Sequence, residues 1–381
     1  MRGETLFPGR IACRTIGPST HRSVAPFRRK SLLNRAFPEP TFVPEQVAVY
    51  QTDHLLAHFA FPFDPVQAAN ALQRDQYVIA IDLGGDKIRR TDYRIRAGRL
   101  IPEAEEVLQA RGGAGYLAFL ERVAAEAAER QVPVGISSAT RLDGTVVTRV
   151  ANLPVFYDDF LAGWGADYAR LFTGPFQVAN DTVAGICGVA TLLVHQGIDI
   201  ADIAFFISGS GFGASVIAGG NAIHVEAAHV PLADALNPLG QPTHCHVPGK
   251  HYVCLDRVVA GRAGIEDIYR QQTGEALDGV ALGARYEANE PLPTLLYETS
   301  ALALAHATAG VMQRYRFAPG DRSVVVYHGG NFELPRYRAA IVRDLKLMPG
   351  SLPLVIFSRD LSANACLDGA AILAAVANEK S

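Results

Sequence analysis

Two spacings of apolar residues recur along the chain, and they predict two kinds of element. Short apolar runs bounded by polar or glycine-rich segments predict buried strands at 77–81, 132–136, 204–207 and 323–327. Residues 116–130 place apolar side chains three and four positions apart, which predicts an amphipathic helix, and the alanine-rich stretch 363–378 predicts a last helix. This mixture predicts an α/β protein whose two lobes each contain a sheet.

Three of the predicted buried strands end in glycine turns. The turns are Asp82–Lys87, Ser208–Gly213 and Gly329–Gly330. Most glycine pairs only form tight turns, but a glycine-rich turn also lets backbone N–H groups approach phosphate oxygens. Three such turns favour a nucleotide held between two lobes, although the chain contains no Walker motif.

The first 76 residues differ from the rest of the chain. Residues 1–45 are basic and punctuated by proline, and we consider three interpretations of them: a flexible arm or over-long start, an organelle transit peptide, and an arm that packs on a partner subunit. The pattern turns helical from Val47 to Gln76, where Asp64-Pro65 predicts the N-cap and first turn of a short helix.

Charge and composition narrow the function classes. The chain has 381 residues and a net charge of −3, but residues 1–36 carry +7 and the remaining 345 residues carry −10. An acidic body argues against nucleic-acid binding as its main activity. Five scattered cysteines predict a reducing compartment, and the uncharged stretch 203–223 is too rich in glycine for a membrane helix. We therefore expect a cytoplasmic protein without membrane or nucleic-acid partners.

Asp181 is the first candidate for chemistry. It follows a short apolar strand with Asn180 and precedes an apolar helix from Thr182 to Val194. An N-cap is the simpler interpretation, because Asp or Asn before a helix accepts hydrogen bonds from its free N–H groups. The functional alternative is a general base in an interlobe cleft, which accepts a hydroxyl proton as that oxygen attacks phosphorus.

A dense polar cluster follows at residues 226–256. It contains Glu226, His229, His244, Cys245, His246, His251, Cys254 and Asp256. Histidines and cysteines at such density predict a tetrahedral zinc site. The alternative is an ordinary polar loop, and Cys-x8-Cys is not a standard zinc-finger pair.

These pieces occur in an order that resembles one protein family. They are Asp82-Leu83-Gly84-Gly85-x-Lys87, Asn152-Leu153-Pro154, Asn180-Asp181, Ser208 to Gly213, Glu226-x-x-His229, Cys254-x-Asp256 and Gly329-Gly330. The order resembles that of the ROK family of sugar kinases and repressors, within the actin-like ATPase and sugar-kinase superfamily. The resemblance covers about Tyr77 to Asn378 and implies a two-lobed, ribonuclease-H-like fold with the active site in the interlobe cleft.

The resemblance also implies a role for each matching residue. It implies cofactor binding by Asp82, Gly84, Gly85, Lys87, Gly209, Ser210, Gly211, Gly213, Gly329 and Gly330. Asp82 would lie near magnesium, and Asp181 would be the catalytic base. Substrate contacts would come from Asn152, Asn180, Glu226, His229 and Asp256. Two metal ligands would be Cys245 and Cys254, with His229 linking the sugar site to zinc, and a fourth ligand would come from His244, His246 or His251.

Several positions depart from the family pattern. Asp86 stands where threonine is usual and would repel nucleotide phosphates unless it binds a metal or turns away. Ala228 replaces the glycine of the Glu-x-Gly-His motif, and Ser137-Ser138 replaces a Pro-Gly. The family's Cys-x-Cys-Gly-x-x-Gly-Cys motif keeps only its first and last cysteine here, as Cys245 and Cys254. Asp256 stands where the family has a sugar-binding glutamate. The altered sugar-site positions Ser137, Ser138, Ala228 and Asp256 indicate a substrate other than plain glucose.

The resemblance therefore implies an ATP-dependent kinase for a sugar, a modified sugar or a cyclitol, with Mg²⁺, a structural Zn²⁺ and a homodimeric state. A sugar-responsive repressor is the first alternative, but residues 1–76 show no recognition helix. A catalytically inactive sugar-binding relative is the second. The expected organisation is an extension at 1–76, a lobe of 77–181 with 361–381, and a lobe of 182–360.

Overall fold

The computed structural model describes residues 57–85, 87–109, 113–150, 153–232, 236–237, 245, 250–320, 322–350 and 352–378. The chain divides into two units after Val47, and every described residue belongs to the second unit. Three predicted site residues, Asp86, Asn152 and His246, lie outside the described residues, as does the basic head. None of the described helices is both long and apolar enough to cross a membrane.

The first lobe contains a five-stranded sheet in the order β4-β3-β2-β5-β8. Its strands are β2 (Gln76–Leu83), β3 (Lys87–Arg96), β4 (Arg99–Gln109), β5 (Val134–Ser138) and β8 (Phe176–Asn180). β2, β5 and β8 are parallel, whereas β2, β3 and β4 form an antiparallel meander. A separate hairpin joins β6 (Thr140–Asp143) to β7 (Val146–Val150) through Gly144.

The second lobe contains a six-stranded sheet in the order β1-β11-β10-β9-β12-β13. Its strands are β1 (Ala57–Pro62), β9 (Asp202–Ser208), β10 (Phe212–Ala218), β11 (Asn221–Val225), β12 (Ser323–His328) and β13 (Leu354–Phe357). β9, β12 and β13 run parallel, so the carboxyl ends of these strands meet at one edge of the sheet. All four apolar runs predicted as buried strands are confirmed, as β2, β5, β9 and β12.

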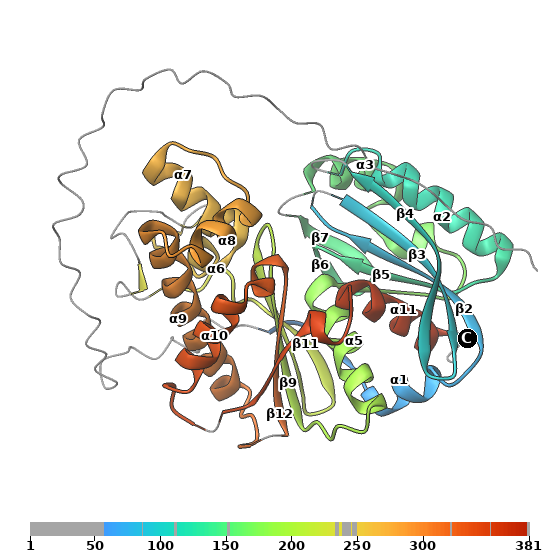
Figure 1. The fold of residues 1–381 in the computed structure, drawn as a ribbon. Coiled ribbons are helices and arrows are strands. Elements are labelled where there is room, and N and C mark those ends of the chain that lie inside the picture. The colour runs from blue at the N-terminus through green and yellow to red at the C-terminus, as the bar shows by residue number, and fades with distance from the viewer. Residues whose placement is uncertain are drawn as a thin grey trace, which may run out of the picture. The chain divides into compact units, whose positions relative to one another are not determined.

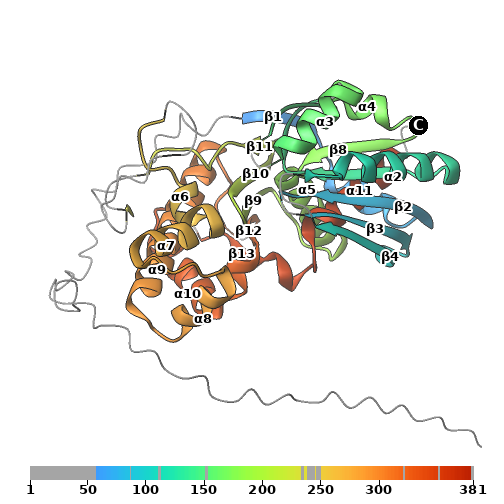
Figure 2. The same ribbon diagram turned by 90° about the horizontal axis from the view of Figure 1, so that it is seen from above.

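Two helices, α5 (Asp181–His195) and α11 (Ala365–Ala377), lie between the sheets and share one core with both (Figures 1 and 2). Val78 of β2 and Phe205 of β9 both belong to that core. The helices cross closely because Gly369 of α11 has no side chain, and a Cβ there would lie 1.8 Å from the Ala184 carbonyl oxygen. The start of α5 is therefore held at the junction of the two lobes.

Most of the other helices cover the outer faces of the sheets (Figure 1), whereas α1 (Pro65–Ala71) packs on α5 and α11. Ile79 and Ile81 of β2 point to the opposite face from Val78, where they pack with α2, which confirms the helix predicted at 116–130. The helices are α1 (Pro65–Ala71), α2 (Tyr116–Arg130), α3 (Pro154–Trp164), α4 (Tyr168–Leu171), α6 (Asp256–Val259), α7 (Asp267–Thr273), α8 (Gly279–Glu287), α9 (Pro291–Arg314) and α10 (Pro335–Leu345), with shorter turns η5 (Gly261–Glu266), η6 (Gly330–Glu333) and η7 (Ser358–Asp360).

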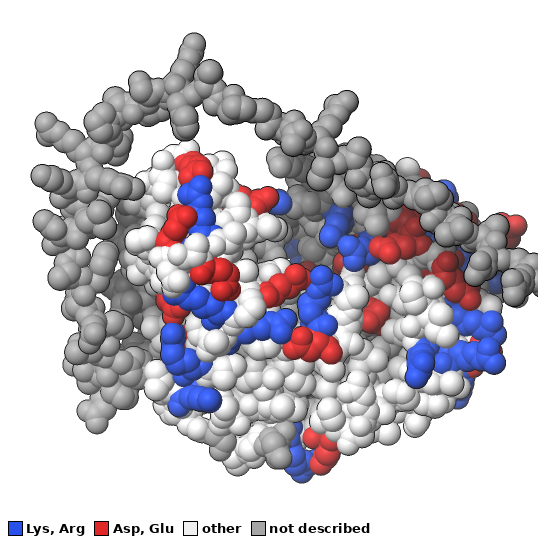
Figure 3. Space-filling model, in the orientation of Figure 1, with Lys and Arg blue, Asp and Glu red and all other residues white. Residues whose placement is uncertain are grey.

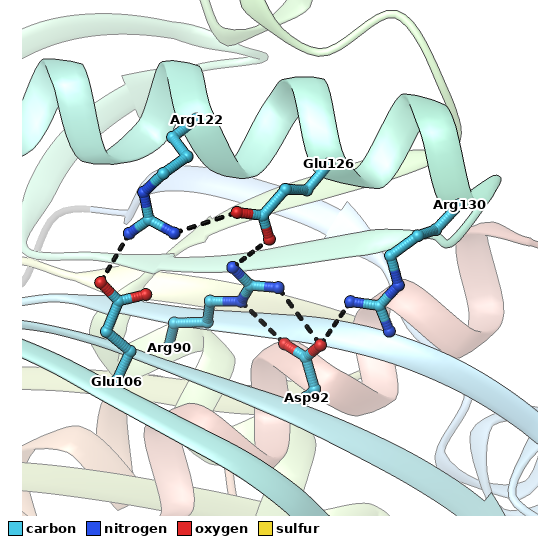
Figure 4. A network of polar contacts seen from close by, with 6 residues as sticks. All are labelled: Arg90, Asp92, Glu106, Arg122, Glu126 and Arg130. Carbon is cyan, nitrogen blue, oxygen red and sulfur yellow. Dashed lines mark hydrogen bonds and ion pairs between the residues drawn. The ribbon is translucent and has the colours of Figure 1, made fainter.

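A chain of ion pairs connects α2 to β3 and β4 (Figure 4). Arg90 and Asp92 on β3 are each only 8% exposed, and their side chains make two hydrogen bonds of 2.7 and 3.2 Å. Arg130 and Glu126 of α2 complete the pairing, at 2.5 Å from Asp92 and Arg90 respectively. Two buried charges are tolerable here because each has an opposite charge within hydrogen-bond distance.

Basic and acidic side chains also lie next to one another on the surface seen in Figure 3. The ion pairs of the second lobe include Arg343–Glu298 at 2.8 Å and Arg359–Glu333 at 2.8 Å. This face of the described body is therefore of mixed charge.

The segment before β2 partly differs from the prediction. α1 begins as expected, since Asp64 Oδ1 accepts a hydrogen bond of 2.8 Å from the Val66 N–H and Pro65 occupies the first turn. The helical pattern predicted from Val47 to Gln76 is wrong for Ala57–Pro62, which form strand β1. β1 pairs with β11, a partner from a distant part of the chain, and this pairing overrides the local pattern.

Candidate functional site

Three neighbouring parallel strands bring the first set of predicted residues together. The register places Asp82 of β2 opposite Ser137 of β5, and Ser138 of β5 opposite Asn180 of β8. The Ser137 hydroxyl donates a 2.9 Å hydrogen bond to Asp82 Oδ1. Asp181 follows Asn180 directly, so two carboxylates lie at the carboxyl edge of one sheet.

Asn180 and Asp181 both accept hydrogen bonds at the start of α5. Asn180 is the N-cap of α5: its Oδ1 accepts hydrogen bonds from the Thr182 N–H at 3.1 Å and the Thr182 hydroxyl at 2.7 Å. Its amide nitrogen donates to the Thr140 carbonyl oxygen at 3.1 Å. Asp181 is the first helical residue, and its Oδ1 also accepts from the Thr182 N–H, at 2.8 Å. The N-cap is thus mainly the task of Asn180, which is 8% exposed.

The two carboxylates are electrostatically unusual. Burial, together with repulsion from Asp82, raises the pKa of Asp181 to about 7. Burial also raises the pKa of Asp82, although hydrogen bonds from Ser137 and Asn364 and the nearby Arg89 and Lys87 oppose that rise. A carboxylate with a pKa near 7 suits a general base at neutral pH, and a neighbouring carboxylate suits Mg²⁺, which prefers oxygen ligands.

The first glycine turn closes the hairpin between β2 and β3 beside Asp82. The Gly84 N–H donates to the Lys87 carbonyl oxygen at 3.0 Å, and the Lys87 side chain is exposed. Asn364, the N-cap of α11, contributes a side chain to the same carboxylate, a contact that the sequence analysis missed. An asparagine before an alanine-rich helix was the available signal, but it predicts only the cap.

The second and third glycine turns meet because β9 and β12 are parallel neighbours. Gly329 has a φ of +132°, and a Cβ there would lie 1.9 Å from the Ser208 carbonyl oxygen, so this close approach requires glycine. Asn331 donates from its amide nitrogen to the Ser208 hydroxyl at 3.3 Å. Gly330, in contrast, faces open space.

Thr182, next to Asp181, contacts strand β10 of the second sheet. Its hydroxyl lies 3.2 Å from the Ala214 carbonyl oxygen of β10, and its methyl group would be 2.7 Å from a Cβ on Gly213. β11 places Val225 opposite Ala214, and Glu226 follows Val225 immediately. The predicted substrate residue Glu226 therefore belongs to the same region as Asp181.

The structure brings together three of the four predicted metal ligands. His229 Nδ1 lies 3.5 Å from Cys245 Sγ and 3.9 Å from Cys254 Sγ, and all three ligand atoms lie within 4.8 Å of one another. Ligand atoms of a tetrahedral zinc site lie about 3.5 to 4 Å apart, so these three fit. Burial and Cys245 raise the pKa of the Cys254 thiol to about 12, so its thiolate requires an adjacent cation.

Asp256 lies deeper than expected for a substrate ligand. Its side chain is 2% exposed, and Oδ1 accepts a 2.7 Å hydrogen bond from the Phe212 N–H in the second glycine turn. Its role as a substrate contact stays a prediction.

Comparison with known proteins places this site in context. The sequence matches the ROK family over residues 78–376. No curated protein sequence matches the chain significantly.

Three solved structures illustrate the likeness in fold. The ROK hexokinase from Thermus thermophilus is 23% identical, with a TM-score of 0.57, over 80% of this chain and 100% of that one. A ROK family glucokinase from Streptomyces griseus, in complex with glucose and AMPPNP, is 19% identical with a TM-score of 0.54, over 78% and 99%. A ROK family transcriptional regulator, a homologue of the E. coli MLC protein, is 16% identical with a TM-score of 0.56, over 85% and 87%. The predicted α/β, actin-like ATPase fold class is confirmed.

Proposed function

Because the chain belongs to the ROK family, we propose that it is an ATP-dependent kinase that phosphorylates a hydroxyl group of a sugar or sugar-like polyol. One observation carries the proposal: Asp181 lies at the junction of the two lobes with its pKa raised to about 7, near a second carboxylate and beside glycine turns. A capping residue alone would not need a raised pKa.

In the proposed reaction, Asp181 accepts the proton of the attacking hydroxyl group. Its Oδ1 is held by the Thr182 N–H, so the carboxylate keeps a fixed direction at the start of α5. Asp82 would hold Mg²⁺, which neutralises charge on the transferring phosphoryl group when bound. Backbone N–H groups of the glycine turns and Lys87 would bind the phosphates.

The acceptor would lie between Asp181 and the end of β11. Glu226 and His229 follow β11 there, and His229 also belongs to the metal cluster. His229 would be held by zinc through Nδ1, the atom that faces both cysteines. The proposal of a modified sugar or a cyclitol rests on the departures from the family pattern at Ser137, Ser138, Ala228 and Asp256. Of these, Ser137 donates a hydrogen bond to Asp82.

A repressor is the alternative supported by a specific observation, the similarity to the transcriptional regulator. That likeness covers 87% of the regulator, whereas the two kinases are covered over 100% and 99% of their lengths. The kinase is therefore the preferred proposal.

The test is an assay of ADP release over hexoses, amino sugars and cyclitols with the wild type and Asp181→Asn. The variant keeps an oxygen for the Thr182 N–H but cannot accept a proton at neutral pH. We expect kcat to fall by at least about 100-fold with little change in KM, which is typical of a lost general base. Asp158→Asn, on the exposed surface of α3, is the control. Wild-type protein that binds ATP but phosphorylates none of these acceptors would overturn the proposal.

A further inference from the structure

The side chain of Asp256 points at the second glycine turn. Its Oδ1 accepts the 2.7 Å hydrogen bond from the Phe212 N–H, and a Cβ on Gly211 would lie only 3.5 Å from the same oxygen. The carboxylate thus fixes the peptide group between Gly211 and Phe212. Because Asp256 is 2% exposed, this hydrogen bond forms away from water. Without it, the buried N–H group would have no acceptor, which would destabilise this conformation of the turn.

The residues that follow Asp256 hold the rest of the turn. The Ser208 hydroxyl donates to the Val259 carbonyl oxygen at 2.9 Å, which anchors the last residue of β9. The Gly261 and Ala263 N–H groups then donate to the carbonyl oxygens of Gly209 and Ser210, at 3.0 and 3.1 Å. The segment 256–263 therefore contacts the turn at four successive points.

Arg257 keeps this segment in place. Its guanidinium group donates to the Ala263 carbonyl oxygen at 2.7 Å and forms a 2.6 Å ion pair with Asp267, and both side chains of that pair are largely buried. The conformation of the turn is thus determined by a braced segment and not by the turn residues alone.

The same segment begins at the metal cluster. Asp256 comes two residues after Cys254, and its N–H donates to the Ala228 carbonyl oxygen at 2.8 Å. The Leu255 N–H donates to the Val230 carbonyl oxygen at 3.2 Å, so these two bonds flank His229 on both sides. One short stretch therefore joins two cluster residues to the glycine turn.

We infer that Asp256 is a positioning residue that holds the second glycine turn in its nucleotide-binding conformation; this inference rests on the proposed kinase function. The family resemblance implies a sugar contact at this position. In this chain, Oδ1 of the aspartate carboxylate accepts a hydrogen bond from Phe212, in the second glycine turn.

The test compares Asp256→Ala with Asp256→Asn. Alanine removes the acceptor for the Phe212 N–H, whereas asparagine keeps an oxygen but removes the charge. The measurements are the affinities for ADP and ATP, by calorimetry, and the rate of amide hydrogen exchange at Phe212. We expect Asp256→Ala to weaken nucleotide affinity by about 10-fold and to increase exchange at Phe212, with Asp256→Asn restoring most of both.

The matched control is Asp202→Ala. Asp202 lies at the other end of β9, and its Oδ2 accepts a 2.9 Å hydrogen bond from the Ala318 N–H. This variant loses a similar hydrogen bond far from the turn, so we expect wild-type nucleotide affinity and wild-type exchange at Phe212.

Two results would overturn the inference. The first is Asp256→Ala that binds nucleotide as the wild type does, with unchanged exchange at Phe212, while its sugar KM rises; this would make Asp256 a sugar ligand. The second is an Asp256→Asn variant whose nucleotide affinity is as low as that of Asp256→Ala. A wild-type chain that binds neither ADP nor ATP would refute the kinase proposal itself, and exchange at Phe212 in Asp256→Ala would still report whether Asp256 holds the turn.

Discussion

The charged form of Asp181 should lower the free energy of unfolding, and the full effect is expected above neutral pH. Its pKa is about 7 in the folded chain, against an ordinary value of 3.8, because burial and Asp82 disfavour the charged form. The folded state therefore binds the proton more tightly than the unfolded state. Protonated Asp181 carries no such penalty below about pH 4, and the penalty grows as the pH rises towards 7 and is complete above it.

Asp181→Asn removes this penalty, because asparagine does not titrate and still accepts a hydrogen bond from the Thr182 N–H. The pKa values of Asp181 in the folded and unfolded states differ by about 3, which corresponds to at most about 4 kcal/mol of unfolding free energy. Solvent reaches the half-buried carboxylate and screens part of this penalty. We therefore expect the free energy of unfolding of the variant to exceed that of the wild type by about 1 to 2 kcal/mol between pH 5 and pH 8.

The assay is urea unfolding of the wild type and variant at several pH values in the absence of nucleotide and Mg²⁺, both of which would change the charge balance. Asp158→Asn on α3 is the control and should give a constant difference across the range. A wild-type protein that gains stability relative to Asp181→Asn as the pH rises would refute the reasoning. Asp82→Asn should make the Asp181 penalty smaller and complete at a lower pH, because removing the repulsion between the two carboxylates lowers the pKa of Asp181 in the folded state.

Three further variants test other parts of the structure. Asp92→Ala removes the two hydrogen bonds that Asp92 accepts from the buried Arg90. It should lower the free energy of unfolding by about 3 kcal/mol, measured by urea denaturation, whereas the exposed Asp360→Ala should change it by less than about 1 kcal/mol. Gly329→Ala should reduce the Tm by several degrees and weaken ADP binding, because its Cβ would clash with the Ser208 carbonyl oxygen; Gly330→Ala, which faces open space, should retain near wild-type Tm. Cys245→Ser should reduce bound zinc, measured by elemental analysis, from about one equivalent to less than half, whereas Cys187→Ser, on α5, should not; equal zinc content in both variants would contradict the three-residue cluster.

Much of the secondary structure follows from local spacing. The apolar runs of β2, β5, β9 and β12 and the periodic face of α2 are properties of neighbouring residues, and the structure confirms them. The capping of α1 by Asp64 is similarly local, since the acceptor and donor lie two residues apart. The order of the motifs along the chain also indicated the family and hence the fold class.

Other features depend on residues that are far apart in the chain. β1 became a strand because β11, about 160 positions later, offers it an open edge. The contact between Asn364 and Asp82 exists only because α11 returns to the first sheet. No local pattern predicts either, because each requires a partner whose position is set by the packing of the whole fold.

The candidate site shows the same division. The sequence alone determined which residues have the right chemistry: Asp82, Asp181, the glycine turns and the cluster of His229 with two cysteines. Only the tertiary structure decided what each residue does within that set. It placed the half-buried Asp181 near a second carboxylate, which raises its pKa, and it brought Oδ1 of Asp256 within hydrogen-bond distance of the Phe212 N–H. Side-chain type is inherited from the sequence, but desolvation and hydrogen-bond direction arise from the residues that folding brings together.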